Sequence, residues 1–161
     1  MSKILVAYYS AQGHTKRAAE IIARKLKADL FELQPVKAYS EADFDWGDFN
    51  SRVSQEHNDE SLRDIDLVQE KPDNWDDYDA VLIGYPIWYG IAAWPVNRFI
   101  KINSFIDKTV VPFATSHSSP LEDSDKLLHQ MTSSGNWRDG VRFYQDAPEG
   151  ELENWAESLG L

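Results

Sequence analysis

Tyr9 to Thr15 read Y-S-A-Q-G-H-T, and this stretch decides the fold because it joins an apolar run to a helical pattern. The apolar run predicts a strand over residues 3–9, and apolar residues spaced at i, i+3, i+4 and i+7 predict a helix over residues 15–27. A loop at a helix N-terminus presents unpaired backbone N–H groups and the positive end of the helix dipole. Both favour a phosphate, so the stretch predicts a phosphorylated ligand.

Strands and helices alternate along the rest of the chain, which is typical of an α/β fold with a mostly parallel sheet covered on both faces. Further strands are expected at residues 30–33, 80–85, 109–115 and 141–143, and helices at residues 51–58, 95–103, 124–131 and 148–160. Pro112 within the fourth strand indicates a missing ladder bond or a bulge. The sequence contains neither a repeat nor a second hydrophobic unit, so residues 1–161 are expected to form a single domain.

Composition narrows the classes of function. The formal net charge of −11 argues against a nucleic-acid partner, because the phosphate backbone binds clustered Lys and Arg. The absence of cysteine excludes disulfides, thiolate metal sites and thiol catalysis, and no metal site is expected. No apolar run is long enough for membrane insertion and no leader pattern opens the sequence, so a cytoplasmic protein is expected. Residues 41–79 carry 14 acidic and 3 basic side chains, which either meet a basic protein partner or only promote solubility.

Three strand ends carry unusual loops, and ligands of open α/β sheets bind beyond the carboxyl ends of the strands. In the first loop, Gly13 permits a close approach of the backbone to a ligand, and the hydroxyls of Ser10 and Thr15 can donate to phosphate oxygens. The loop has no lysine and no G-x-G-x-x-G pattern, which excludes a P-loop and disfavours a dinucleotide site. The alternative interpretation is a plain helix cap formed by Thr15.

The second loop, G-Y-P-I-W-Y-G at residues 84–90, places Trp88 next to Tyr89. Consecutive side chains cannot both point into one core, so one ring should be exposed and suited to stacking on a planar ligand. The alternative is that Trp88 packs beneath the loop. The third loop, T-S-H-S-S at residues 115–119, either offers small polar groups to the edge of a heterocycle or is an ordinary turn. His117 has no identifiable partner, so it is interpreted as a loop histidine rather than an acid–base group.

A phosphate cradle, an aromatic platform and a polar loop on neighbouring strands describe a binding site for a mononucleotide with a flat ring. FMN fits this description better than ATP. The reason is that no lysine and no obvious Mg²⁺-binding carboxylate lies near the phosphate loop.

The chain resembles the flavodoxin family over nearly its whole length, and in particular a short branch with a P-I-W-[WY]-G loop. The resemblance rests on Y-Y-S-A-Q-G-H-T at residues 8–15, Y-x-x-A-D-F-x-W-x-D at 39–48 with Ser51, Arg52 and Glu56 after it, D-D-Y-D-A-V-L-I-G-Y-P-I-W-Y-G at 76–90, V-V-P-F-A-T-S at 110–116 and W-R-D-G-V-R-F at 137–143. It implies a three-layer fold with a five-stranded parallel sheet of order 2-1-3-4-5 and FMN at its carboxyl edge.

By position, the resemblance also implies a set of cofactor-binding residues from the three loops. They are Ser10, Ala11, Gln12, Gly13, His14 and Thr15, then Pro86, Ile87, Trp88, Tyr89 and Gly90, and finally Thr115, Ser116, His117 and Ser118. Two of them depart from the family pattern. Gln12 stands where many members have Thr or Ser, and His117 stands where related loops often have Gly.

The leading hypothesis is an FMN-binding electron-transfer protein that serves redox partner proteins and has no catalytic residue of its own. The acidic surface is expected to oppose negative charge on the fully reduced flavin and to lower its potential relative to free FMN. The alternative is an NAD(P)H-dependent FMN oxidoreductase acting on quinones or similar planar acceptors, with residues 35–77, bearing Trp46 and Phe49, as a lid. A receiver or hydrolase is disfavoured, because Tyr8 to Ser10 replace acidic residues and no G-x-S-x-G elbow is present.

Overall fold

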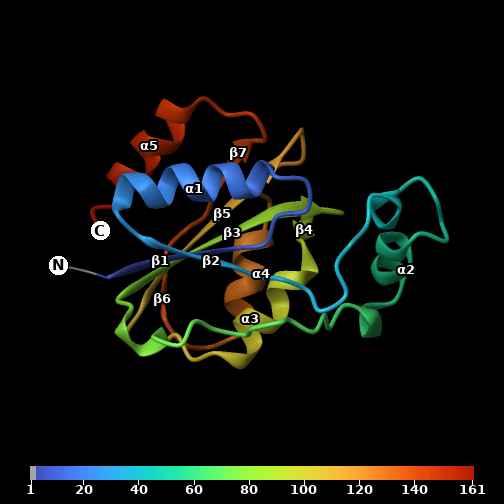
Figure 1. The fold of residues 1–161 in the computed structure, drawn as a ribbon, viewed down its shortest axis with the longest axis horizontal. Coiled ribbons are helices and arrows are strands. Elements are labelled where there is room, and N and C mark those ends of the chain that lie inside the picture. The colour runs from blue at the N-terminus through green and yellow to red at the C-terminus, as the bar shows by residue number, and fades with distance from the viewer. Residues whose placement is uncertain (1–2) are drawn as a thin grey trace.

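A parallel β-sheet lies between two layers of helices in the computed structural model, which describes residues 3–161 (Figure 1). The strands are β1 (Ile4–Tyr8), β2 (Asp29–Glu32), β3 (Ala80–Trp88), β4 (Ile91–Ala92), β5 (Thr109–Ser116), β6 (Asn136–Trp137) and β7 (Val141–Tyr144). The helices are α1 (His14–Leu26), α2 (Arg52–Asn58), α3 (Asn97–Ile102), α4 (Ser124–Gln130) and α5 (Glu149–Ser158). Short 3₁₀ turns lie at Ala42–Phe44, Glu60–Leu62, Trp75–Asp77 and Trp94–Val96.

The order of the core strands is the predicted one. The sheet runs β2-β1-β3-β5-β6, with β7 also paired to β5, so the edge position beside β5 is shared by two short strands. If the antiparallel β4 is set aside, β5 is the fourth strand of the parallel sheet and the divided edge of β6 and β7 is the fifth. The order of these five strands is then 2-1-3-4-5. The antiparallel β4 adds a further strand to the sheet, through its pairing with β3. The three-layer flavodoxin-like α/β fold is therefore confirmed.

Each face of the sheet has its own apolar core. Helices α1 and α5 cover one face and α3 and α4 cover the other (Figure 1). The central strands β1, β3 and β5 are buried on both faces, which explains why their sequences read as continuous apolar runs rather than as alternating patterns. Within residues 3–161, no helix has the length and apolar character that crossing a bilayer requires.

Gly84 lies at the centre of this sheet, opposite Tyr8 on one side and Phe113 on the other. A Cβ atom placed on Gly84 would lie 2.4 Å from Cζ of Phe113, whose side chain is fully buried. The phenyl ring therefore occupies the space that a side chain at position 84 would need.

The predicted fifth strand at residues 141–143 is one half of a divided edge. Val110 pairs with Trp137 in β6, and Phe113 pairs with Val141 in β7, so the edge carries one more residue than β5 between these two pairs. Pro112 lies opposite the break and has no N–H to donate. The interruption expected at this proline is thus present, and it takes the form of an extra residue on the neighbouring strand.

The prediction that the third strand ends at residue 85 and is followed by an irregular loop is wrong. Strand β3 continues to Trp88, turns at Tyr89 and Gly90, and returns as β4. Both turn residues have positive φ, 52° for Tyr89 and 81° for Gly90, as a two-residue type I′ hairpin requires. Glycine adopts this backbone freely, whereas tyrosine rarely does, and so the sequence lacks the usual hairpin signal.

Buried tyrosines predict a loss of stability at alkaline pH. Burial raises the pKa of Tyr8 to about 12, and burial together with the Asp29 hydrogen bond raises that of Tyr78 to about 12. Burial also raises the pKa of Tyr85 above its usual range. Because the folded state favours the neutral phenols, their stabilisation is complete below the unfolded value of about 10 and is lost as the pH rises through 12.

We therefore expect the unfolding free energy to fall steeply between pH 10 and 12, as measured by urea titration at stepped pH. Tyr78→Phe should make this decline shallower. A curve that stays flat to pH 12 would contradict the assignment of neutral buried phenols.

Candidate functional site

A cavity of about 410 Å³ opens at the carboxyl edge of the sheet, within the size range of small-molecule sites. The three predicted loops all reach it, together with residues that precede and begin α2. Its walls comprise Ala11, Gln12, His14, Thr15, Phe44, Trp46, Val53, Pro86, Ile87, Trp88, Tyr89, Thr115, Ser116, His117, Ser118, Ser119 and Gln145. The structure thus brings together segments that lie more than 100 residues apart in the sequence.

Of the predicted site residues, all except Ser10, Gly13 and Gly90 line the cavity. These three residues shape the loops that carry the lining. The predicted set of cofactor-binding residues lacks Phe44, Trp46 and Val53 from the α2 side, and Ser119 and Gln145 from two loops. Trp46 was expected near the site only as part of the lid in the alternative hypothesis, and Ser119 only as the last residue of the third loop. Exposed aromatics in the polar segment of residues 35–77 were the available signal for the first group, but nothing in the sequence indicates where that segment folds back.

Ser10 organises the phosphate-type loop from behind. Its Oγ accepts hydrogen bonds from the backbone N–H groups of Gly13 and Lys16, each at 3.1 Å. Gly13 is the N-cap of α1 with a φ of 92°, so Ser10 satisfies the first and the last of the four N–H groups that a helix start leaves unpaired. The N–H groups of His14 and Thr15, between them, have no acceptor in the part of the chain that the structure describes, and they lie at the positive end of the helix dipole. Ser10 still has its own hydroxyl proton to donate.

The interpretation of Thr15 as a helix cap is wrong, because Thr15 lies inside the first turn and Ser10 serves the N–H groups instead. The Oγ1 of Thr15 lies 2.7 Å from Oγ1 of Thr115, and both residues are buried. This bond ties the first loop to the end of β5. One hydrogen bond between two hydroxyls uses one of their two protons, so one O–H remains to serve a ligand.

His14 lines this part of the cavity. Nδ1 of its imidazole ring lies 3.7 Å from Oδ1 of Asp146. Within residues 3–161 there is no cluster of side chains suited to holding a metal ion. The groups at the start of α1 that could hold an anion are backbone N–H groups, hydroxyls and the helix dipole.

The β3–β4 hairpin separates the two adjacent aromatics. Tyr89 is 41% exposed, and its ring stacks on the imidazole of His57 at 3.8 Å between centroids. Trp88 is half-buried and meets other rings edge-on or tilted, at centroid distances of 5.0–5.7 Å to Tyr9, Tyr39, Phe44 and Trp94. The expectation that one of the two rings is exposed is confirmed, and the exposed one is Tyr89. Trp88 is both a packed residue and part of the cavity wall.

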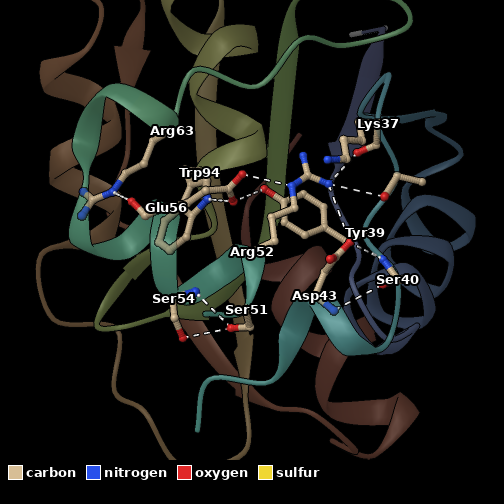
Figure 2. A network of polar contacts seen from close by, with 11 residues as sticks. Lys37, Tyr39, Ser40, Asp43, Ser51, Arg52, Ser54, Glu56, Arg63 and Trp94 are labelled. Carbon is tan, nitrogen blue, oxygen red and sulfur yellow. Dashed lines mark hydrogen bonds and ion pairs between the residues drawn. The ribbon is translucent and has the colours of Figure 1, made fainter. Parts of the chain in front are cut away.

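A polar network centred on Glu56 supports this aromatic cluster (Figure 2). The buried carboxylate accepts hydrogen bonds from the Tyr39 hydroxyl at 2.5 Å and the Trp94 indole at 2.8 Å, both on Oε1, and from Nε of Arg52 at 3.1 Å on Oε2. Burial and then the Glu56 hydrogen bond raise the pKa of Tyr39 well above its usual range. The guanidinium of Arg52 lies 3.6 Å from the centroid of the Tyr39 ring.

This network fixes the segment that precedes α2 against the sheet edge. Arg52 also donates through Nη1 to the carbonyl oxygens of Lys37 and Ala38, at 2.8 and 3.4 Å. Residues 39–58 project beyond the ends of β1 and β3 (Figure 1). The part of the aromatic wall that precedes α2 is thus held in place by Arg52 and by the buried carboxylate of Glu56.

The third loop is held from the neighbouring strand. Ser116 donates through its hydroxyl to the carbonyl oxygen of Ser119 at 2.5 Å, which closes the turn. Arg142 of β7 donates to the hydroxyl of Ser116 and to the carbonyl oxygens of Ser116 and His117. His117 is exposed, and its ring lies 5.8 Å from that of Tyr144, with no hydrogen bond to its side chain within residues 3–161. Its position agrees with a loop histidine.

The residues at the cavity fit FMN on their own chemistry. Two free N–H groups and a spare hydroxyl at the start of α1 suit a phosphate. Rings on the hairpin side suit a flat heterocycle, and the polar loop after β5 suits its hydrogen-bonding edge. This combination defines a mononucleotide-binding α/β protein whose site lies at the carboxyl edge of the sheet.

Comparison with known proteins gives the family. The flavodoxin family model matches residues 3–159, which is nearly the whole chain. The chain belongs to the flavodoxin family. Comparison with curated proteins yields no match.

Solved structures agree with this assignment. A candidate flavoprotein from Bacteroides eggerthii is 39% identical over 100% of this chain and 99% of its own, with a TM-score of 0.88. A second from Bacteroides uniformis is 37% identical over 97% and 98% of the two chains, with a TM-score of 0.87. A flavoprotein from Lactobacillus acidophilus, solved in complex with FMN, is 25% identical over 97% and 99%, with a TM-score of 0.67. Family membership and this FMN complex support FMN as the cofactor, as the sequence predicts.

Proposed function

We propose that this chain is an FMN-binding electron carrier. The observation that carries the proposal is the convergence of an anion-binding helix start, an aromatic hairpin and a polar loop on one cavity. Bound FMN supplies the redox chemistry, since it accepts and returns electrons. The residues of this chain bind the phosphate, orient the ring and keep water from it with the aromatic wall.

The test is reconstitution of the purified protein with FMN, followed by visible spectra during stepwise reduction with dithionite. We expect stoichiometric binding of FMN and spectra that depart from those of free FMN at each stage. A protein that stays colourless after incubation with FMN would contradict the proposal.

A second candidate function is an NAD(P)H-dependent oxidoreductase acting on quinones or similar planar acceptors. It is favoured by the position of Trp46, which lines the cavity while 79% of its surface is exposed, so that a second planar molecule could stack there. Steady-state oxidation of NADPH with a quinone acceptor distinguishes the two. Turnover in this assay would favour the enzyme, and its absence with reversible FMN reduction would favour the carrier.

Thr15→Ala should weaken FMN binding by roughly 10- to 100-fold, since a hydrogen bond to a charged group contributes about 1.5–3 kcal/mol. The flavin-free protein should lose only about 1 kcal/mol, because the bond between Thr15 and Thr115 also disappears. Fluorescence titration of FMN and urea unfolding of the apoprotein measure the two effects. Thr15→Ser, which keeps the hydroxyl, is the control. Equal FMN affinity in the alanine variant would exclude a role for this hydroxyl in binding.

The acidic surface supports a proposal about the redox partner. Glu41, Asp45 and Asp48 are exposed beside Trp46 and Phe49, which are 79% and 70% exposed. Negative charge around exposed rings complements a basic protein surface that carries an apolar patch. We therefore propose a basic redox protein as the partner, and association that weakens as salt is added.

The same charges should act on the flavin. We expect the potential for the second electron to lie below that of free FMN, because surrounding carboxylates oppose negative charge on the fully reduced ring. Added salt should reduce the difference. Potentiometric titration at low and high ionic strength measures it, and a potential equal to that of free FMN would contradict the effect.

A further inference from the structure

Arg142 lies behind the polar loop and makes its contacts there. It sits in β7 opposite Ala114 of β5, and its half-buried side chain reaches the loop that follows β5. Nε donates to Oγ of Ser116 at 2.8 Å, and Nη2 donates to the carbonyl oxygens of Ser116 at 3.1 Å and His117 at 3.0 Å. One guanidinium therefore holds two successive peptide units. The N–H of Gln145 also donates to the Ser116 carbonyl oxygen, at 3.0 Å, whereas the His117 carbonyl has Arg142 alone among the described residues.

These hydrogen bonds to the carbonyl oxygens also fix the direction of the N–H groups of His117 and Ser118. In a trans peptide the C=O and the following N–H point in opposite directions. With the carbonyls of Ser116 and His117 turned toward Arg142, the N–H groups of His117 and Ser118 point away from it. Neither N–H finds an acceptor within residues 3–161, and both residues line the cavity. The two N–H groups are thus free donors in the loop that faces the ligand.

Arg142 also carries a charge that no carboxylate neutralises at short range. None of the ion pairs among residues 3–161 involves it, whereas Arg52, Arg63 and Arg98 each have acidic partners. The hydrogen-bonded oxygens of Ser116 and His117 solvate the guanidinium without cancelling its charge. Because the side chain is half-buried, water and salt screen this charge less than they screen the exposed carboxylates.

We propose that Arg142 is a positioning residue that aims the N–H groups of His117 and Ser118 at the polar edge of bound FMN and raises the potential for its second electron. The proposal rests on the proposed function, since it concerns the flavin held in the cavity. Full reduction adds negative charge to the polar side of the flavin ring, and charge near that side tunes its electronics. A fixed positive charge and two aligned N–H groups favour the reduced form over the oxidised one. The acidic surface is expected to lower the potential for the second electron, and Arg142, behind the polar loop, acts in the opposite direction.

Two substitutions separate the effect of the positive charge of Arg142 from the effect of its hydrogen bonds to the loop carbonyl groups. Arg142→Gln removes the charge but leaves a side-chain N–H donor. Arg142→Lys keeps the charge, yet a single ammonium cannot reproduce the planar fork that holds both carbonyls. Arg138→Gln is the matched control: it removes the same charge from an exposed arginine whose side chain contacts the carbonyl oxygen of Leu159.

The measurements are the dissociation constant of oxidised FMN and the potential for the second electron, on reconstituted protein. In Arg142→Gln, fully reduced flavin should lose affinity about tenfold more than the one-electron-reduced flavin, which corresponds to a potential about 59 mV lower for the second electron. Arg142→Lys should change the relative affinity for the fully reduced and the one-electron-reduced flavin by no more than about twofold, so that the potential stays close to that of the parent protein. Oxidised FMN should nevertheless bind more weakly to this variant. Arg138→Gln should change neither quantity.

The proposal is overturned if Arg142→Gln leaves the potential unchanged, or if Arg142→Lys lowers it as much as Arg142→Gln does. The lysine variant carries the test alone if the glutamine variant does not fold, because it must keep the potential and lose affinity for oxidised FMN. Failure of the unsubstituted protein to bind FMN would instead overturn the proposed function. The two failures are therefore distinguishable.

Discussion

Glu56→Ala is expected to lower the free energy of unfolding by about 3–5 kcal/mol, because it removes the closer of the two carboxylates beside the largely buried charge of Arg52 and leaves only Asp43, at 4.0 Å. The same change removes the acceptor for the Tyr39 hydroxyl and the Trp94 indole N–H, which are then buried without a hydrogen bond. Urea unfolding of the apoprotein measures the loss. The aromatic wall around Trp88 should loosen at the same time, so tryptophan fluorescence should shift toward that of exposed indole.

The matched control for this substitution is Glu60→Ala in the following turn. Glu60 also contacts an arginine, with 3.6 Å between its Oε1 and Nη1 of Arg63, but its side chain is 88% exposed. An exposed pair of this kind contributes little, so Glu60→Ala should leave stability nearly unchanged. If the two variants lost similar amounts of unfolding free energy, the contribution of Glu56 to stability would not depend on its burial.

Gly84→Ala is expected to destabilise the protein by about 1–3 kcal/mol, or more if the backbone of β3 has to move. The added Cβ would lie 2.4 and 2.6 Å from two carbons of the Phe113 ring, which is enclosed on all sides and cannot swing away. Phe113→Leu in the same chain should recover part of the loss, because a smaller side chain vacates that space. Thermal and urea unfolding of the single and double variants give the coupling between the two sites.

Gly150→Ala is the matched control for the glycine substitution. Gly150 lies in α5, and a Cβ there would meet nothing within 4 Å. Alanine is the better helix former, so this variant should gain about 0.5–1 kcal/mol. A loss in Gly150→Ala, or no loss in Gly84→Ala, would contradict the argument that the cost depends on contact with Phe113.

The parallel sheet and the edge at which the cavity opens were predictable from the sequence because they depend on local signals, whereas the order of the strands came from the resemblance to the flavodoxin family. The apolar runs of β1, β3 and β5 are long enough to identify buried parallel strands, and the small loop after β1 precedes an amphipathic helix. Ligands of such sheets lie at the carboxyl edge, so three loops could be assigned to one site without coordinates. The identity of each donor was less accessible, as Ser10 and Thr15 show: both carry hydroxyls, but one braces the loop and the other reaches β5.

The hairpin after β3 could not be predicted, since Tyr89 adopts a positive φ that only the pairing of β3 with β4 compensates. The lid expectation included Trp46, but the sequence did not indicate that Phe44 and Trp46 form a wall of the cavity, because the segment that carries them has no periodicity and is fixed by hydrogen bonds to side chains of α2. These features depend on contacts that are not encoded by neighbouring residues.

The sequence by itself determined the fold class, the edge of the sheet at which the cavity opens and the strand–loop–helix unit that lines it. Each of these follows from hydrophobic periodicity and from the backbone chemistry of a strand–loop–helix unit. Only the tertiary structure decided which groups complete the Y-S-A-Q-G-H-T site. Thr15 meets Thr115 across 100 residues, and Arg142 meets Ser116 across 26. Such pairings form when the whole sheet closes, because the geometry of a hydrogen bond depends on three-dimensional position and not on sequence spacing.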